Sequence, residues 1–210
     1  MRKEINETVT LRFSDRIAKI ILRLMGWKTK GQVPPYPKYV MIGYPHTSNW
    51  DAFVGLVVFK SMGVHLKWLA KKSLFKWPLS WILKWAGAVP IQREKSQNLV
   101  QKVKEIFNNS EQFVLTLSPE GTRKKTDYWR TGFYYMALEA GVPIALSFLD
   151  YPNKTGGFGP VLWPSGDIEK DMETIREFYK GIHGKFPEQE GAIRIKPRNN
   201  HSENSEEEKS

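Results

Sequence analysis

The chain contains no cysteine in its 210 residues. This absence excludes a thiol nucleophile, a disulfide framework and cysteine metal ligands, but it does not fix the cellular compartment. No uninterrupted apolar run is long enough for a transmembrane helix. Residues 1–7 also lack the apolar core and the small-residue cleavage site of a secretory signal peptide. We therefore expect a cytoplasmic protein, and the composition described next suggests that it lies on a membrane surface.

Acidic residues are outnumbered, because 32 lysines and arginines stand against 22 aspartates and glutamates, which gives a formal net charge of +10. A basic chain with eight tryptophans indicates an anionic partner: nucleic acid, anionic lipid or a phosphorylated substrate. No recognised nucleic-acid-binding motif is present, so we expect no nucleic-acid partner. A non-enzymatic basic protein that binds membranes or nucleic acid remains the rival hypothesis.

Apolar segments of strand and helix type alternate along the chain. This order predicts an α/β fold with a mostly parallel central sheet and helices on both of its faces. Residues 150–164 are rich in glycine and proline and predict a loop. We expect strands over 39–42, 65–70, 88–91, 113–117, 143–149 and 191–196, and helices over 52–62, 78–87, 96–109, 132–141 and 167–182.

Residues 9–26 predict an N-terminal amphipathic helix. Four basic residues recur at helical spacing and form one narrow stripe, while apolar residues cover most of the remaining arc. Such a helix can lie on a membrane, with acyl chains below it and lipid phosphates beside it. It can equally pack on the protein's own core with the stripe in water. The stripe consists of Arg12, Arg16, Lys19 and Arg23.

Three tryptophans, Trp77, Trp81 and Trp85, stand four residues apart and share one face of the helix expected over 78–87. Tryptophan and lysine together are typical of the membrane–water interface, although a buried aromatic stripe has the same spacing. We therefore predict a peripheral protein on the inner face of the cell membrane. Its expected parts are an N-terminal membrane-surface helix with a linker (1–33), a catalytic domain (34–197) and a disordered acidic tail (198–210).

A histidine and an aspartate five residues apart lie at a predicted strand-to-helix junction, where α/β folds tend to place ligands. His46 follows the strand, and Asp51 falls in the first turn of the helix. From there, the carboxylate can fold back to one ring nitrogen and leave the other free to accept a proton from a hydroxyl. The plain alternative is a helix cap with a histidine in the turn.

A second polar loop, Glu120-Gly121-Thr122-Arg123, follows the strand expected over 113–117. Its glycine lets the backbone approach a ligand, its threonine offers a hydroxyl, and its arginine offers a forked, permanently charged donor. Arg93 ends another expected strand and can face the same crevice. Two arginines beside a His-Asp pair suggest a phosphorylated alcohol held for deprotonation, whereas the alternative is a turn with surface ion pairs.

Taken together, these stretches resemble the glycerophospholipid acyltransferases, the group that includes the lysophosphatidic acid (1-acyl-glycerol-3-phosphate) acyltransferases. The resemblance covers about residues 36–150. Four blocks of that family occur here in the same order. They are His46 to Asp51 for H-x-x-x-x-D, Lys72 to Arg93, Pro119 to Arg123, and Gly141 to Ile144.

The resemblance implies a glycerol-phosphate acyltransferase-like fold and an O-acyltransferase of phospholipid biosynthesis. His46 would act as general base and Asp51 would orient it. Backbone amides near the helix start would steady the oxyanion. The implied co-substrate is acyl-CoA or acyl carrier protein, and no cofactor or metal is implied. The acceptor phosphate would be held by Arg93, Glu120, Gly121, Thr122 and Arg123.

Three positions depart from the commonest pattern of that family. Pro45 stands where asparagine is often found, Ser118 replaces phenylalanine, and Lys124 stands where serine is common. The His-Asp pair is unaffected. The departures leave the acceptor open between 1-acyl-glycerol-3-phosphate, another lysophospholipid and an amino-acid-derived lipid such as lyso-ornithine lipid.

Overall fold

A computed structural model describes residues 12–78, 80–81, 83, 87–91 and 96–197 of the chain. The expected acidic tail, Arg93, Trp85 and half of the helix expected over 78–87 (residues 79, 82 and 84–86) therefore lie outside the described residues.

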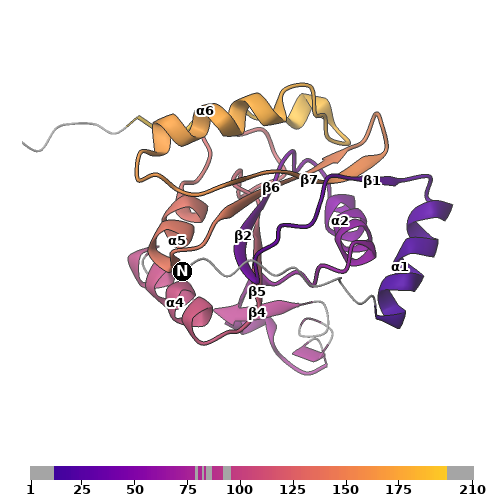
Figure 1. Cartoon of the computed structure of the whole chain (residues 1–210), viewed down its shortest axis with the longest axis horizontal. Helices are drawn as coiled ribbons and strands as arrows, with labels where there is room; N and C mark the ends of the chain where they lie inside the picture. The colour runs from indigo at the N-terminus through magenta and orange to yellow at the C-terminus, as the bar shows by residue number, and fades with distance from the viewer. Residues whose placement is uncertain (1–11, 79, 82, 84–86, 92–95, 198–210) are drawn as a thin grey trace, which may run out of the picture.

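The centre of the molecule is a five-stranded sheet with the strand order β1-β7-β6-β2-β5 (Figure 1). β2 runs parallel to β5 and to β6, and β1 runs parallel to β7. Only the β6–β7 pair of this sheet is antiparallel. The prediction of a mostly parallel α/β sheet is thus confirmed. The strands are β1 (Lys28–Lys30), β2 (Lys38–Gly43), β5 (Phe113–Leu117), β6 (Ile144–Asp150) and β7 (Thr155–Leu162).

A two-stranded parallel sheet extends the fold beyond β5. It consists of β3 (Trp68–Lys71) and β4 (Ala88–Ile91), and a short 3₁₀ helix, η1 (Lys72–Leu74), follows β3. A single parallel bridge between Lys67 and Leu115 joins this small sheet to β5. The end of β4 therefore lies on the β5 side of the central sheet.

Helices cover both faces of the sheet. Both faces are apolar, because successive side chains of the buried strand β2 point to opposite sides. Val40 and Ile42 pack into one hydrophobic cluster with α4, α5 and α6. Tyr39 and Met41 point to the opposite face and pack with α1 and α2 (Figure 1). The helices are α1 (Phe13–Leu24), α2 (Trp50–Ser61), α4 (Ser96–Asn108), α5 (Gly132–Ala140), α6 (Ile168–Tyr179) and the 3₁₀ helix η2 (Pro187–Gln189).

The first helix docks on the protein with only part of its apolar surface. Ala18 and Leu22 are buried in the contact with α2, whereas Phe13 and Leu24 are 79% and 83% exposed. The apolar surface of α1 is therefore divided, because one strip packs inward and another faces solvent. Within the described part of the chain, no helix is both long enough and apolar enough to cross a bilayer.

The prediction of a loop over residues 150–164 is wrong, because most of this segment forms β7. Its glycines allow close packing. A methyl group at Gly156 would come within 2.8 Å of the Leu149 side chain, and one at Gly159 would overlap the ring of Phe178. Pro160 lies where the β6–β7 register shifts, so the strand tolerates a residue without an amide hydrogen.

Two further differences concern short strands. The strand expected over 191–196 is absent from the described residues there, and only a single bridge joins Ile195 to Trp129. β1 was not predicted, because it is three residues long and lies in a segment rich in glycine and proline. It pairs with β7 at the edge of the sheet.

The contact between β1 and β7 generates a stability prediction. Gly31 has φ +81°, and a methyl group added there would overlap the carbonyl oxygen of Phe158. Gly181 has a similar φ of +74° but open space around it. We expect Gly31→Ala to lower the unfolding free energy by about 3 kcal/mol and Gly181→Ala by about 1 kcal/mol. Urea denaturation measures both, and equal losses would contradict the packing argument.

Candidate active site

Three loops meet at the carboxyl ends of neighbouring strands. His46 follows β2, Glu120 follows β5 and Tyr151 follows β6. These three strands are adjacent and parallel, so their carboxyl ends lie at the same edge of the sheet. Crevices at such edges are where open α/β sheets bind ligands.

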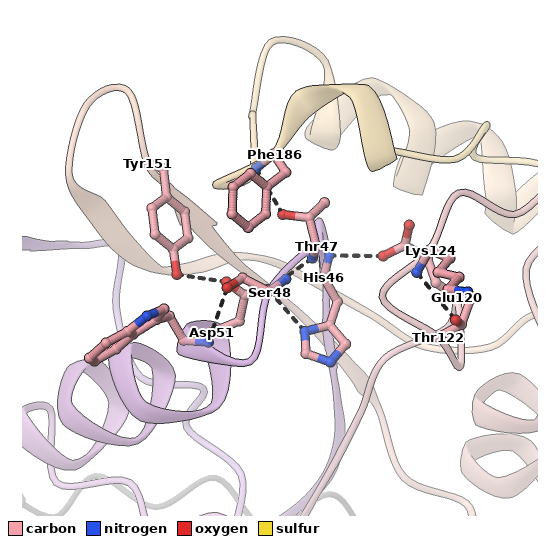
Figure 2. Close-up of polar contacts among 10 residues, drawn as sticks. His46, Thr47, Ser48, Asp51, Glu120, Thr122, Lys124, Tyr151 and Phe186 are labelled. Atoms are coloured by element: carbon pink, nitrogen blue, oxygen red, sulfur yellow. Dashed lines mark hydrogen bonds and ion pairs between the residues drawn. The ribbon is translucent and has the colours of Figure 1, made fainter.

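The side chains of His46 and Asp51 form a hydrogen-bonded pair, with 3.0 Å between His46 Nδ1 and Asp51 Oδ2 (Figure 2). The same carboxylate oxygen accepts hydrogen bonds of 2.9 Å from the backbone amides of Thr47 and Ser48. Asp51 lies in the first turn of α2, so its carboxylate folds back over the helix start, as its sequence position predicts.

The other carboxylate oxygen of Asp51 accepts a hydrogen bond of 2.6 Å from the hydroxyl of Tyr151 (Figure 2). Burial by itself would raise the pKa of Asp51. Hydrogen bonds from His46, Tyr151 and the Ser48 amide outweigh burial and hold the pKa below its ordinary value. Asp51 is therefore a carboxylate at neutral pH.

The hydrogen bond to an ionised Asp51 determines the roles of the two ring nitrogens of His46. Nδ1 carries the hydrogen and donates it to the carboxylate, so Nε2 of the neutral ring has a free lone pair. Nε2 makes no hydrogen bond to any described residue, and it points away from Asp51 in Figure 2. The His46 side chain is 27% exposed, so this nitrogen can accept a proton from a bound hydroxyl.

His46 and the second loop line one pocket of about 500 Å³. Two cationic side chains lie on its wall. Arg123 and Lys124 are exposed, and neither forms an ion pair with any carboxylate that the structure describes. An anionic group would therefore find uncompensated positive charge beside His46. The lining residues are His46, Ser118, Gly121, Thr122, Arg123 and Lys124.

Glu120 does not lie on the wall of this pocket. Its side chain is buried, with the residue 2% exposed, and Oε2 accepts a hydrogen bond of 2.8 Å from the His46 backbone amide. Burial raises the pKa of Glu120 to about 7, and the hydrogen bond from the His46 amide partly opposes this rise. The structure thus places this glutamate behind the histidine, as a link between the two loops, and not beside a ligand.

The backbone at Gly121 has φ +63°, a left-handed conformation that favours glycine. A third cation, Arg130, packs against this turn, and a methyl group at Gly121 would come within 2.7 Å of its Nε. The Thr122 hydroxyl accepts a hydrogen bond from the Lys124 amide at 3.2 Å. The loop is therefore a tight, basic turn, whereas Arg93 lies outside the described residues and is not placed beside it.

Most amides at the start of α2 have partners within the protein. Those of Thr47 and Ser48 donate to Asp51, that of Trp50 donates to the Ser48 hydroxyl, and that of Asp51 donates to the Ser48 carbonyl. Asn49 is the remaining residue between Thr47 and Asp51. The expectation that a backbone amide here steadies an oxyanion therefore applies to the amide of Asn49.

Residues 183–191, here called the C-terminal strap, pack against both loops. The Phe186 amide donates to the Thr47 hydroxyl at 3.1 Å, and the Tyr44 hydroxyl donates to the Gly191 carbonyl at 3.0 Å. With its amide nitrogen facing them, Gln189 donates to the carbonyls of Arg123 and Thr47. The sequence motifs gave no indication of this strap.

Tyr151 was also missed from the sequence. A search for polar residues within four positions after each expected strand would have included it, because it stands two residues beyond the strand expected over 143–149. The same search finds His46 and Glu120.

The comparisons with known proteins show the family and the fold of this chain. A model of the Acyltransferase family matches residues 28–145, more than half of the chain. The chain therefore belongs to the Acyltransferase family, and the resemblance seen in its four sequence blocks is confirmed. A search of curated proteins finds no match.

The fold is similar to the crystal structure of the 1-acyl-sn-glycerophosphate (LPA) acyltransferase PlsC from Thermotoga maritima. The TM-score is 0.54 and the sequence identity is 15%, over 77% of this chain and 74% of that chain. At this identity, the comparison shows that the two proteins share a fold and no more. It agrees with the α/β architecture described above.

The raised pKa of Glu120 predicts a specific pH dependence of stability. Glu120 titrates near 4.5 in the unfolded chain and near 7 in the folded protein. Between these values, the folded protein keeps a proton that the unfolded chain has released, so this residue makes stability fall as pH rises. Relative to Glu120→Gln, the wild type should lose about 2–3 kcal/mol of unfolding free energy between pH 4.5 and 7.

Urea denaturation at intervals across this pH range measures the difference. Glu139→Gln, which changes an exposed glutamate on α5, is the matched control and should show no such trend. A difference between wild type and Glu120→Gln that stays constant from pH 4.5 to 7 would contradict the prediction.

Proposed function

We propose that this protein transfers a fatty acyl group from acyl-CoA or acyl carrier protein to the hydroxyl of a lysophospholipid, most specifically 1-acyl-glycerol-3-phosphate, in phospholipid biosynthesis. The observation that carries the proposal is that His46, held by Asp51, lines one pocket together with two cations that form no ion pair with a described carboxylate, in a member of the Acyltransferase family. The solved structure of similar fold belongs to a protein named for the same acceptor class.

In the proposed reaction, His46 Nε2 takes the proton of the acceptor hydroxyl while the hydroxyl oxygen attacks the thioester carbonyl. Asp51 holds the imidazole and stabilises the imidazolium that forms. Collapse of the tetrahedral intermediate breaks the carbon–sulfur bond, and the imidazolium returns the proton to the departing thiolate. The products are an ester and a free thiol, and His46 is neutral again.

The acceptor's phosphate would lie against the second loop. Arg123 supplies a forked donor and Lys124 a point charge, both on the wall that also carries His46. We propose that Arg93 adds a further contact from the segment after β4. Thr122 and Gly121 shape the turn, whereas Glu120 acts indirectly by holding the His46 backbone.

The first activity test is thiol release from palmitoyl-CoA, with lysophosphatidate presented in mixed micelles. We expect release that requires the acceptor and that falls by about 10² to 10⁴-fold in His46→Ala, because the general base is removed. His65→Ala is the matched control, because His65 is the half-exposed partner of Asp15 on α1 and should keep full activity.

The remaining outcomes separate the alternatives. If palmitoyl-CoA gives no release, acyl carrier protein carrying the same acyl group replaces it. Turnover of lyso-ornithine lipid in preference to lysophosphatidate would move the acceptor assignment to an amino-acid-derived lipid. Absence of turnover with every donor and acceptor would contradict the proposal and favour the non-enzymatic rival, which a salt-dependent shift on DNA or vesicle binding would then test.

We also propose that the protein lies peripherally on the inner face of the cell membrane. α1 presents four apolar side chains to solvent, and Trp50 and Phe53 at the start of α2 are exposed as well. Trp77 and Trp81 are 92% and 73% exposed, so these two are not part of a buried aromatic stripe. Aromatic rings and basic residues together favour anionic lipid interfaces. The four residues on α1 are Phe13, Ile17, Ile20 and Leu24.

The proposed domain boundaries shift slightly with the structure. β1 lies inside the segment first assigned to the helix and linker, yet it pairs with β7 of the central sheet. We therefore propose an acyltransferase domain over 28–197, preceded by the membrane-surface helix, with an acidic tail over 198–210.

Replacing the two most exposed apolar residues of α1 tests the membrane proposal. We expect Phe13→Ser with Leu24→Ser to weaken binding to vesicles containing anionic lipid by about tenfold or more, because two large apolar side chains no longer enter the interface. Leu138→Ser, which changes a partly exposed leucine on α5, is the control. Co-sedimentation with vesicles measures binding, and equal binding by all three proteins would contradict the prediction.

A further inference from the structure

Tyr151 completes the hydrogen bonding of the Asp51 carboxylate. Oδ2 of Asp51 already bonds His46 Nδ1 and two backbone amides, all from residues within five positions in the sequence. Oδ1 has one partner among the described residues, the Tyr151 hydroxyl at 2.6 Å. This bond spans 100 positions in the sequence, so it ties the carboxylate to a different part of the fold.

Two other segments hold Tyr151 in place. Its backbone amide donates to the carbonyl of His183 at 3.0 Å, at the start of the C-terminal strap. Its ring meets the buried ring of Trp27 edge to face, with 5.0 Å between centroids and 89° between planes. The hydroxyl therefore approaches Asp51 from a fixed position.

We propose that Tyr151 is a positioning residue of the His46–Asp51 pair, which fixes the carboxylate in the orientation that lets Oδ2 accept the Nδ1 hydrogen of His46. The inference rests on the proposed function, in which Asp51 orients the general base. It goes beyond the family match, which ends at residue 145.

The chemistry of the phenol suits this role. A carboxylate that is held at one oxygen only can rotate, because the terminal torsion angle of an aspartate side chain has a broad distribution. A second hydrogen bond on the opposite oxygen fixes the plane of the group. Burial, reinforced by the nearby Asp51 carboxylate, raises the pKa of Tyr151, so the hydroxyl keeps its hydrogen and remains a donor at neutral and mildly alkaline pH.

The direct test is Tyr151→Phe, which keeps the ring packed on Trp27 and removes only the hydroxyl. We expect kcat for thiol release to fall on the order of tenfold, because a hydrogen bond to a charged group is lost and His46 is less well oriented. The KM for the acceptor should change by less than about twofold, since Tyr151 does not line the pocket beside His46.

Tyr134→Phe is the matched control. Its hydroxyl donates to the carboxylate of Asp171 at 2.7 Å and accepts from the Gly166 amide at 2.9 Å, so the substitution removes a buried tyrosine–aspartate bond away from His46. Both variants are assayed at a temperature at which circular dichroism shows them folded. If Tyr134→Phe lowers kcat as much as Tyr151→Phe does, the effect is one of general stability and the proposal fails.

A double-mutant cycle with Asp51→Asn tests whether Tyr151 acts through the carboxylate. In the Asp51→Asn background, Tyr151→Phe should have no further effect on kcat, because the group that it positions has lost its charge. If Tyr151→Phe lowers kcat by the same factor in both backgrounds, Tyr151 does not act through Asp51.

The cycle also separates this inference from the proposed function. If Asp51→Asn leaves kcat unchanged, the His-Asp mechanism is wrong and the role proposed for Tyr151 is wrong with it. If Asp51→Asn abolishes turnover while Tyr151→Phe keeps the wild-type kcat, the mechanism stands and only the positioning role fails.

Discussion

The arrangement of the site depends on one buried carboxylate. Asp51 accepts four hydrogen bonds, and they come from the loop after β2 and from the turn after β6. Because these bonds favour the ionised form, the charge remains on Asp51 despite its burial, and His46 receives a fixed partner. Helix geometry contributes as well, since a carboxylate in the first turn of α2 is stabilised by the positive end of the helix dipole.

The sheet places the other components around this carboxylate. The strand order sets β2 between β5 and β6, so the loop of His46 lies between that of Glu120 and that of Tyr151. Each outer loop contributes one hydrogen bond: Glu120 bonds the backbone of His46, and Tyr151 bonds the side chain of Asp51. The histidine is thus held at its main chain by one neighbour and, through Asp51, at its ring by the other. The cations of the second loop then face the same pocket as its free nitrogen.

Contacts between residues that are close in the sequence could be predicted from it, and contacts between distant residues could not. His46 and Asp51 are five positions apart, so their contact is local to the loop that leads into α2 and to the first turn of that helix. The alternation of strands and helices likewise follows from local patterns. Glu120 reaches His46 across 74 positions, and Phe186 reaches Thr47 across 139, so both contacts depend on the strand order and on where the chain returns. β7 was misjudged because its glycines indicate a turn in sequence, whereas in space they let Val58, Leu149 and Phe178 approach the strand.

The C-terminal strap limits how short a fragment of this enzyme can be while it still contains the whole site. A fragment chosen to match residues 28–145 would contain His46, Asp51 and the basic loop, but it would lack Tyr151 and the Phe186 amide that bonds Thr47. The stretch that defines membership of the family is therefore shorter than the stretch that builds the site. Residues 183–191 touch both loops although they lie outside the residues that the family model matches. A change in this segment would therefore alter the surroundings of the pair and leave the pair's own sequence block intact.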